Sequence, residues 1–587
     1  MLRLAIVQFR PRKGAYAENL AQLEEALRGV AALPEPPDLL LLPETALSGY
    51  FLEGGVREQA RTAEEVAADV AAVHRASGAP PLDLALGFYE LWRNCHYNSC
   101  AYLSLGAGEP VLRHVHRKVF LPTYGVFDEE RFVEAGSEVR AFDTAWGRAA
   151  MLVCEDAWHS LMPTLAALDG AQLLLVVSAT PARGLDSPEA PANLERWERL
   201  ASDAAAEHGM YVAVAQLVGF EGGKAFAGGS VVAGPAGRVL ARGPLFEPGL
   251  VRADLDFEEI TRVRAEQPLL ADLRNRLPRL LAELGRAPGA AAEAATWEGR
   301  AAGRVRPGAV TPPRGEDPLA INPELARRWL VEFLRDEVRR RRGFERVVLG
   351  LSGGVDSAVV AYLAAEALGA EHVVAVRMPY RTSSPDSLAH AQLVIDALGI
   401  QARTVDISAG VDGIAGAIGG EPDPAALGNI MARMRMITLF DLSARLRALP
   451  LGTGNKTERL FGYFTWHADD SPPVNPIGDL FKTQVWALAR HLGVPLAIVD
   501  KPASADLVQG QTDEADFGIR YDRADHILHW LLSGYRPPQV VALGYEAAEV
   551  ELVRKRLDGT HWKRRLPTVA MLSQTAIGEY YLRPVDY

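Results

Sequence analysis

A glycine-rich turn in the second half of the chain joins an apolar run to a helical pattern. The run RVVLGLS (residues 346–352) predicts a buried strand, and VDSAVVAYL, two glycines later, predicts a helix. Glycines let backbone N–H groups approach an anion closely, and the N-terminal end of a helix favours phosphate. The stretch therefore predicts a phosphate-binding loop for ATP. Its candidate residues are Gly350, Leu351, Ser352, Gly353, Gly354, Val355, Asp356 and Ser357.

An aspartate stands in this loop where a Walker A loop carries a lysine. Asp356 cannot bind phosphate directly, but its carboxylate can hold Mg²⁺, which binds phosphate. Such a loop suits cleavage of ATP between the α- and β-phosphates, with AMP passed to an acceptor and pyrophosphate as the leaving group. The competing interpretation is a plain glycine turn, but the VDS sequence and the flanking strand and helix favour the phosphate loop.

Three polar residues in the first half follow or adjoin predicted strands. Glu44 ends DLLLLPE, Lys118 lies in HRKVFLPTYGVFDEER, and Cys154 follows AAMLV. A cysteine attacks a carbonyl as thiolate, and a nearby glutamate can accept its proton. A lysine beside it favours the thiolate and stabilises an oxyanion, which the backbone N–H of Glu155 can also bind. Together the three residues predict amide hydrolysis, whereas Cys154 alone reads as a buried structural cysteine.

Other arrangements for releasing ammonia from an amide do not fit the sequence. An N-terminal nucleophile requires cysteine at position 2, where Leu2 stands, and Cys154 is not flanked by the glycines of a Gly-x-Cys-x-Gly turn. Ammonia released by the first half has a use in the second half. Displacing AMP with nitrogen requires neutral ammonia, and free ammonium is mostly protonated at neutral pH.

The elements that must position these residues form two separate α/β patterns. In the first half, buried strands are predicted at LRLAIVQF, DLLLLPE, DLALGFYE, NSCAYLSL, AAMLVCED, AQLLLVVSA and MYVAVAQLV, and amphipathic helices at ENLAQLEEALRGVAAL and AEEVAADVAAVHRA. In the second half RVVLGLS, HVVAVRMP and ARTVDIS, each followed by helical sequence, predict βαβ units and a parallel sheet. Residues 285–318 are rich in Ala, Gly, Pro and Arg. We predict domains at 1–275 and 319–587 and a linker at 276–318.

Length and composition restrict the class of protein. The 587 residues exceed one ordinary core, and 48% hydrophobic with 23% charged residues is a globular composition. A net charge of −12 argues against a general nucleic-acid or membrane-surface binder. Three cysteines do not form a disulfide framework and fit a reducing cytoplasm. We find no apolar run of membrane-spanning length and no signal-peptide pattern at the first residues.

The second half resembles a known family. The SGGVDS loop resembles that of the N-type ATP pyrophosphatases, and MPYRTSSPDSL, GNIMARMRM, GTGNKTERLFGYFT, NPIGDLFKTQVWALA and KPASADLVQGQTDEADFG resemble NAD synthetases. The resemblance implies ATP contacts at Thr453 and Ser504, and metal ligands at Asp356 and Glu458. Residues implied to bind deamido-NAD are Asn429, Arg433, Glu458, Tyr463, Phe464, Thr465, Trp466 and Lys563. The sequence departs from the family at 467–470, where HADD replaces a Gly-Asp pair and leaves two candidate aspartates.

The first half resembles the nitrilase superfamily. Its LPE, HRKxxLPxYGVFDE and CED patterns are similar to the glutaminase domain of glutamine-dependent NAD synthetases. The resemblance implies a catalytic triad of Glu44, Lys118 and Cys154. It implies a second carboxylate at Glu129, with neighbouring Glu130 as the alternative. It also implies that glutamine is bound by Tyr124, Thr180 and Arg183.

Taken together, the two resemblances imply an αββα nitrilase-like sandwich followed by a doubly wound parallel sheet with ATP at its switch point. The expected reaction is ATP-dependent amidation of deamido-NAD to NAD with ammonia from glutamine, using Mg²⁺. We expect small-molecule substrates, no nucleic acid or membrane partner, and a homo-oligomer, from a dimer to an assembly such as an octamer. The alternatives are a glutamine-dependent amidotransferase acting on another carboxylate, and a binding or sensor protein with a decayed active site.

Overall fold

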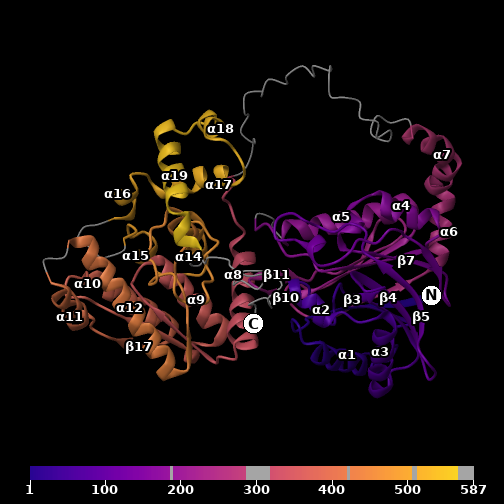
Figure 1. Cartoon of the computed structure of the whole chain (residues 1–587), viewed down its shortest axis with the longest axis horizontal. Coiled ribbons are helices and arrows are strands. Elements are labelled where there is room, and N and C mark those ends of the chain that lie inside the picture. The colour runs from indigo at the N-terminus through magenta and orange to yellow at the C-terminus, as the bar shows by residue number, and fades with distance from the viewer. Residues whose placement is uncertain (186–189, 286–316, 420–422, 505–511, 566–587) are drawn as a thin grey trace. The chain divides into compact units, whose positions relative to one another are not determined.

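The computed structural model describes residues 1–185, 190–285, 317–419, 423–504 and 512–565 (Figure 1). These residues form two compact units. The first contains Met1–Gly184 and residues 190–285, and the second contains Leu185 and the described residues from 317 to 565. Most of the predicted linker, and residues 505–511 of the last family-like motif, lie outside the described residues. Helix α7 (Leu269–Leu284) covers the beginning of that linker, and the domain boundaries stay a prediction.

Two six-stranded sheets form the centre of the first unit. The first sheet has the order β14 (Gly249–Leu255), β1 (Leu2–Gln8), β2 (Leu39–Leu41), β3 (Leu82–Trp92), β4 (Cys95–Leu105) and β5 (Val111–Arg117). The second has the order β13 (Val239–Arg242), β12 (Val231–Ala233), β9 (Tyr211–Gln216), β8 (Leu173–Ser178), β7 (Arg148–Val153) and β6 (Ala141–Asp143). Strands β1, β2 and β3 run parallel, as do β7, β8 and β9. A hairpin of β10 (Val218–Glu221) and β11 (Lys224–Ala227) is separate.

Helices cover the outer face of each sheet, so that the first unit has four layers (Figure 1). Helices α1 (Tyr16–Ala31) and α3 (Ala63–Ser77) share one core with strands of the first sheet. In α1 the buried Leu23, Leu27 and Val30 recur at helical spacing. Helices α4 (Leu161–Leu168) and α5 (Ala192–His208) cover the second sheet. The remaining helices are α2 (Val56–Gln59) and α6 (Phe257–Glu266) with α7. The predicted αββα sandwich is confirmed.

The second unit is built on a four-stranded, fully parallel sheet. Its order is β17 (Gln401–Thr404), β16 (Val373–Arg377), β15 (Arg346–Gly350) and β18 (Ala448–Pro450). The chain proceeds outward from β15 to β17 and then returns to the other side of β15, so the strand order reverses between β15 and β18. Ligands of open α/β sheets bind at the carboxyl ends of the strands beside such a reversal. The predicted doubly wound fold is confirmed.

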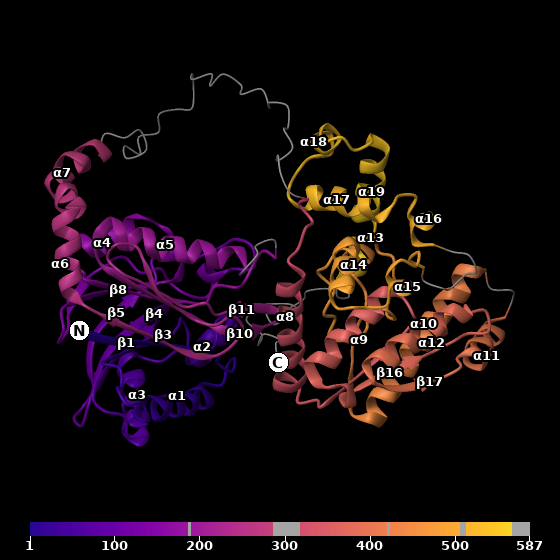
Figure 2. The ribbon, with the colours of Figure 1, turned by 180° about the vertical axis from the view of Figure 1, so that it is seen from behind.

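Both faces of this sheet are covered by helices (Figure 2). Helix α12 (Pro424–Leu446) packs on one face, through Leu442 against Val348 and Val374. The other face has α8 (Pro323–Leu334), α9 (Val355–Leu368), α10 (Pro385–Leu398) and α14 (Lys482–His491). The other helices are α11 (Ser408–Ile418), α13 (Lys456–Phe461), α15 (Leu496–Val499), α16 (Asp513–Phe517), α17 (Tyr521–Leu532), α18 (Pro537–Ala542) and α19 (Ala547–Gly559). Within the described residues, we find no helix with the length and apolarity to cross a membrane.

Candidate active sites

Cys154 lies at a strained turn directly after β7. Its backbone φ is 46°, in the left-handed region that non-glycine residues rarely adopt. Strand β7 runs parallel to β8 with Val153 paired to Val177, so Cys154 leaves the sheet next to Ser178, the last residue of β8. The cysteine side chain is buried. Strain held at one residue of a well-packed sheet edge points to function.

A buried ion-pair network brings residues of both sheets together. Lys118 Nζ donates to Glu44 Oε1 at 2.9 Å and lies 2.8 Å from Glu129 Oε2. Asn98 Nδ2 donates to Glu44 at 2.7 Å and to Glu129 at 3.0 Å. The second oxygen of Glu44 accepts the backbone N–H of Ala179 at 2.7 Å. Donors from three separate segments therefore fix the glutamate predicted to be the base.

Burial and charge set the protonation of this network. Burial alone would lower the pKa of Lys118, but Glu129 and Glu44 hold it well above its ordinary value. Burial and the charge of Glu44 raise the pKa of the Cys154 thiol to about 12, although Lys118 and the hydroxyls of Ser178 and Thr180 oppose this rise. The lysine is thus a permanent cation, and the cysteine is a thiol that requires a base before it can attack.

The three predicted glutamine-binding residues lie around the cysteine turn. Thr180 Oγ1 lies 3.6 Å from the sulfur. The hydroxyl of Tyr124 donates to Glu155 Oε2 at 2.7 Å, although the tyrosine ring is largely exposed. Arg183 lies against Gly125, because a Cβ added to that glycine would be 3.3 Å from the guanidinium Nη2. Thr180 therefore lies against the nucleophile itself, while Tyr124 contacts the next residue and Arg183 lies beside the Tyr124 loop.

The sequence left Glu129 and Glu130 open as the second carboxylate. Glu129 is buried against Lys118, whereas Glu130 is exposed. Asn98, which bridges the two carboxylates, was not predicted. Its position at the start of the predicted strand NSCAYLSL was a signal, because a buried amide in a strand requires partners.

Asp156 was also missed, and it ties the cysteine turn to the lysine segment. One oxygen accepts the backbone N–H groups of Val119 and Phe120, at 3.0 and 2.9 Å. The other accepts the N–H of Val153 at 3.1 Å and lies 2.9 Å from Nε2 of His116. The CED pattern contained this residue, but its partners are set by tertiary structure.

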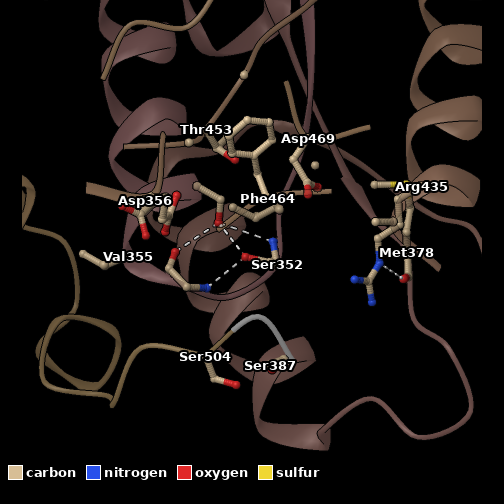
Figure 3. A pocket seen from close by; sticks show the side chains of 18 of the residues that line it. Ser352, Val355, Asp356, Met378, Ser387, Arg435, Thr453, Phe464, Asp469 and Ser504 are labelled. Atoms are coloured by element: carbon tan, nitrogen blue, oxygen red, sulfur yellow. Dashed lines mark hydrogen bonds between the residues drawn. The ribbon is translucent and has the colours of Figure 1, made fainter. Parts of the chain in front are cut away.

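In the second unit, a pocket of about 320 Å³ opens at the carboxyl ends of β15 and β18 (Figure 3). The predicted phosphate loop forms part of its wall. Gly353 has φ 79°, and a Cβ there would lie 2.2 Å from the carbonyl oxygen of Ser387, so only glycine fits. Ser352 Oγ accepts the N–H of Gly354 at 3.2 Å and lies 3.1 Å from Ser357 Oγ. These internal bonds fix the loop before any ligand arrives.

A buried lysine lies beside the two predicted metal ligands. Lys482 Nζ is ion-paired with Asp356 and lies 3.9 Å from Glu458 Oε1. Asn455 Nδ2 donates to the other oxygen of Asp356 at 3.1 Å and also caps α13. Burial and the charge of Asp356 raise the pKa of Glu458 to about 8. Two crowded carboxylates facing a phosphate loop fit Mg²⁺, which is usually bound by one or two carboxylates plus substrate phosphates.

The predicted nucleotide residues divide between the pocket wall and a neighbouring loop. The predicted residues on the wall are Gly350, Leu351, Ser352, Gly354, Val355, Asp356, Ser357, Thr453, Glu458, Tyr463, Phe464 and Ser504. The predicted residues outside this wall are Gly353, Asn429, Arg433, Thr465, Trp466 and Lys563. Thr465 Oγ1 donates to Asn429, Arg433 donates to the carbonyl of Trp466, and Lys563 donates to the carbonyl of Phe464. The side chains of Asn429, Arg433 and Lys563 therefore support the loop 463–466.

The wall also contains charged residues that the sequence did not single out. Arg435 of α12 lines the pocket, and Figure 3 shows it across the pocket from Asp356. Lys501 and Asp513 line it too. Asp469 and Asp470 both reach the pocket, and Asp469 additionally accepts the N–H of Thr465. Both aspartates therefore stay candidates for contact with the substrate.

The fold and the two sites define a chain that joins a cysteine-based amide-hydrolase domain to a phosphate-loop domain. Residues 3–265 match the carbon–nitrogen hydrolase family, and residues 327–567 match the NAD synthase family. Among curated relatives, the NH(3)-dependent NAD(+) synthetase of Chlorobaculum parvum is 49% identical over 263 residues, which are 44% of this chain and 94% of that protein. That of Fusobacterium nucleatum is 43% identical over 259 residues, 44% of this chain and 99% of that protein. The chain belongs to the NAD synthase family, with a carbon–nitrogen hydrolase domain preceding the synthase domain.

Two solved structures share the whole fold. A glutamine-dependent NAD+ synthetase from Acinetobacter baumannii, in complex with ADP, matches with a TM-score of 0.71 and 24% identity over 100% of this chain and 98% of its own. One from Cytophaga hutchinsonii matches with a TM-score of 0.69 and 17% identity over 96% of this chain and 93% of its own. The order of domains inferred from the sequence motifs is confirmed.

Proposed function

We propose that the chain is a glutamine-hydrolysing NAD+ synthase, a ligase that converts deamido-NAD to NAD with ATP and with ammonia taken from glutamine. The observation that carries the proposal is one chain holding both an NAD synthase unit and a complete glutamate–lysine–cysteine site. An NAD synthase that takes ammonia from solution has no need of Cys154, Lys118 and Glu44. The close likeness of residues 327–567 to NAD(+) synthetases favours deamido-NAD over another carboxylate as the acceptor.

In the first unit, the Cys154 sulfur attacks the side-chain amide carbon of glutamine while Glu44 accepts the thiol proton. Lys118 and the backbone N–H of Glu155 stabilise the oxyanion that forms. Collapse breaks the C–N bond, and Glu44 returns the proton to the departing nitrogen, so that ammonia leaves and a thioester remains. Water then attacks the thioester, its proton passes to Glu44 and on to the sulfur, and glutamate is released.

In the proposed glutamine complex, Tyr124, Thr180 and Arg183 bind the amino-acid end of the substrate. Arg183 carries the positive charge that complements an α-carboxylate. The tyrosine and threonine hydroxyls supply neutral hydrogen bonds nearby. Glu129 pairs with Lys118 beside Glu44 and holds the ammonium in place.

In the second unit, the carboxylate of deamido-NAD attacks the α-phosphorus of ATP, and the bond to the β-phosphate oxygen breaks. Ammonia then attacks the resulting acyl adenylate, AMP leaves, and the nitrogen loses a proton to solvent. Asp356 and Glu458 would hold Mg²⁺, which supplies positive charge to the departing pyrophosphate. Lys482 neutralises phosphate charge, and the N-terminal end of α9, which begins directly after the glycine pair, favours the pyrophosphate.

The remaining recognition roles are assigned on the same basis. Thr453 and Ser504 contact ATP from the pocket wall. The deamido-NAD residues act in two ways: Tyr463 and Phe464 line the pocket, while Asn429, Arg433 and Lys563 hold the loop 463–466, which includes Thr465 and Trp466, in place. We also propose a cytoplasmic protein, since all three cysteines are free, and a homo-oligomer.

An end-point assay with ATP, Mg²⁺ and deamido-NAD tests the function. With glutamine as nitrogen donor, we expect NAD, AMP, pyrophosphate and glutamate, with NAD equal to AMP. Replacing deamido-NAD with xanthylate or aspartate should give no AMP; AMP formed with either acceptor would favour the alternative amidotransferase. No turnover with any acceptor would favour a decayed site.

A further inference from the structure

The segment that ends β8 contacts both the base and the nucleophile of the first unit. Side chains of an extended segment alternate between opposite sides, so Ser178 and Thr180 face one way and the backbone of Ala179 lies between them. The N–H of Ala179 donates to Glu44 at 2.7 Å. Both flanking hydroxyls lie next to the Cys154 sulfur, at 3.5 Å for Ser178 and 3.6 Å for Thr180.

The hydrogen bonds around this hydroxyl pair have a defined direction. The indole N–H of Trp197, which is a donor only, points to Thr180 Oγ1 at 2.9 Å. The two hydroxyl oxygens lie 2.8 Å apart and so share one hydrogen bond. Whichever hydroxyl donates in that bond, the other has one proton left, and within the hydrogen bonds of the structure its acceptor is the sulfur. The pair therefore always presents one O–H donor to Cys154.

We propose that Ser178 and Thr180 form a hydroxyl pair that stabilises the Cys154 thiolate, with Ser178 as a further catalytic residue of amide hydrolysis. The proposal rests on the proposed function of Cys154. Ser178 is 0% exposed and makes no contact with solvent, so its hydroxyl is not a surface feature. Its position one strand away from the nucleophile, in the parallel register of β7 and β8, makes it a fixed donor.

The need for such donors follows from the site. The sulfur is buried, and two carboxylates lie within the same network, so a negative charge on Cys154 is disfavoured there. Lys118 supplies the opposing charge, but both of its carboxylate partners share it. Hydrogen bonds to a charged acceptor are roughly twice as strong as neutral ones. An O–H donor held against the sulfur therefore favours the thiolate without adding net charge.

Alkylation by iodoacetamide tests the proposal without requiring turnover. The thiolate sulfur forms a bond to carbon and displaces iodide, and the reagent carries a primary amide like that of glutamine. The rate at each of the three cysteines is measured by mass spectrometry of separated peptides at about pH 8. Removing both hydroxyls takes the O–H donor from the sulfur and raises the thiol pKa by roughly one unit, and the more basic thiolate is partly compensated by greater nucleophilicity. We therefore expect the double variant Ser178→Ala/Thr180→Val to slow labelling of Cys154 by roughly threefold or more. Each single variant leaves the other hydroxyl free to donate to the sulfur and should label near the parental rate.

Internal controls separate this effect from damage to the fold. Cys100 is 0% exposed and should stay unlabelled, and Cys95, which is half-buried, should keep its parental rate. The variant Ser178→Ala/Thr180→Ser retains one hydroxyl and should keep a rate near the parental one at Cys154. If Ser178→Ala/Thr180→Val unfolds the domain, Cys100 becomes reactive, and the comparison of Ser178→Ala/Thr180→Ala with Ser178→Ala/Thr180→Ser then decides.

Two results would overturn the proposal. One is a Cys154 rate in the folded double variant Ser178→Ala/Thr180→Val equal to or above the parental rate. The other is an equal loss in Ser178→Ala/Thr180→Val and Ser178→Ala/Thr180→Ser, which would point to packing instead of the hydroxyl. Failure of the proposed function is a different outcome: a Cys154→Ala variant that still hydrolyses glutamine removes the thiolate from the reaction altogether.

Discussion

The buried ammonium of Lys482 gives a quantitative test of the electrostatics in the second unit. Its side chain is 2% exposed, is ion-paired with Asp356 and lies 3.9 Å from Glu458. A Lys482→Met variant keeps a long unbranched side chain and removes the charge. Two carboxylates, 16% and 19% exposed, then remain in a partly buried site without a cation. Breaking a fully buried pair costs roughly 3–5 kcal/mol, which is the upper range for this site. For a unit of this size about 1 kcal/mol corresponds to roughly 2–4 °C, so we expect its melting temperature to fall by up to about 6–20 °C.

Calorimetry at about pH 8 measures the loss, with Lys456→Met as the matched control. Lys456 is also ion-paired, at 2.9 Å, but its partner Asp479 is 97% exposed. An exposed pair of this kind contributes at most about 1 kcal/mol. The control should therefore melt within a few degrees of the parent.

The pH dependence of the same variant follows from the sign of the Glu458 shift. Burial and Asp356 raise the pKa of Glu458 to about 8, above its ordinary value of 4.5. A carboxylate with a raised pKa in the folded state favours folding most at low pH, and this contribution is lost as the pH rises toward 8. Without Lys482 the pKa of Glu458 rises further. The loss of melting temperature in Lys482→Met should therefore be smaller at about pH 6, and added Mg²⁺ should also make this loss smaller. A fall in melting temperature at about pH 8 no larger than that of Lys456→Met would refute this reasoning.

Four other substitutions test single roles. Asp356→Asn should abolish pyrophosphate release and leave glutamine hydrolysis intact; normal release at saturating Mg²⁺ would exclude it as a metal ligand. Glu44→Gln should slow glutamine hydrolysis by roughly 10²–10⁴-fold, and a loss below about tenfold would mean that Glu44 is not the base. Cys154→Ala should lose glutamine as donor but still make NAD from ammonium salt, more so at higher pH; loss of both donors by a folded variant would contradict separable sites. Gly353→Ala, whose Cβ would lie 2.2 Å from the Ser387 carbonyl oxygen, should weaken ATP binding by roughly tenfold or more, because a side chain in the left-handed region costs about 1–2 kcal/mol before any clash; unchanged ATP affinity in a titration would contradict a tight loop.

The apolar strands were predictable because the buried strands of both sheets read as continuous hydrophobic runs. AQLLLVVSA and AAMLVCED became β8 and β7, and the parallel βαβ pattern of the second half became β15, β16 and β17. Strand β5, VLRHVHR, was not predicted, because its alternating polar residues do not form an apolar run. Its alternating apolar and polar residues also indicate a strand, but we interpreted this stretch only as the segment that leads to Lys118.

The face of helix α12 that lines the pocket could not be predicted from the sequence. The family resemblance implied that Asn429 and Arg433 bind deamido-NAD, and residues four apart share one helix face. The pocket is lined instead by Ala432, Arg435 and Leu439 of the same helix. The stretch MARMRMITLF has long apolar or cationic side chains in every direction, so no periodic stripe indicates which face is turned inward. Which arginine meets the pocket depends on how the helix packs against β15 and β18.

Each site contains a buried lysine beside two carboxylates, but the two reactions should depend differently on pH. Lys118 is kept charged by Glu44 and Glu129 well above its ordinary pKa, so it does not titrate where the enzyme would operate. The pH dependence of glutamine hydrolysis should therefore come from the Cys154 thiol and its base. Synthesis from ammonium salt depends additionally on the fraction of neutral ammonia in solution, which increases about tenfold per pH unit below the ammonium pKa. Ammonia released inside the protein does not require that deprotonation in bulk solvent. If ammonia passes directly to the second site, the rate with glutamine should rise less steeply with pH than the rate with ammonium, and equal slopes would mean that the released ammonia equilibrates with solvent first.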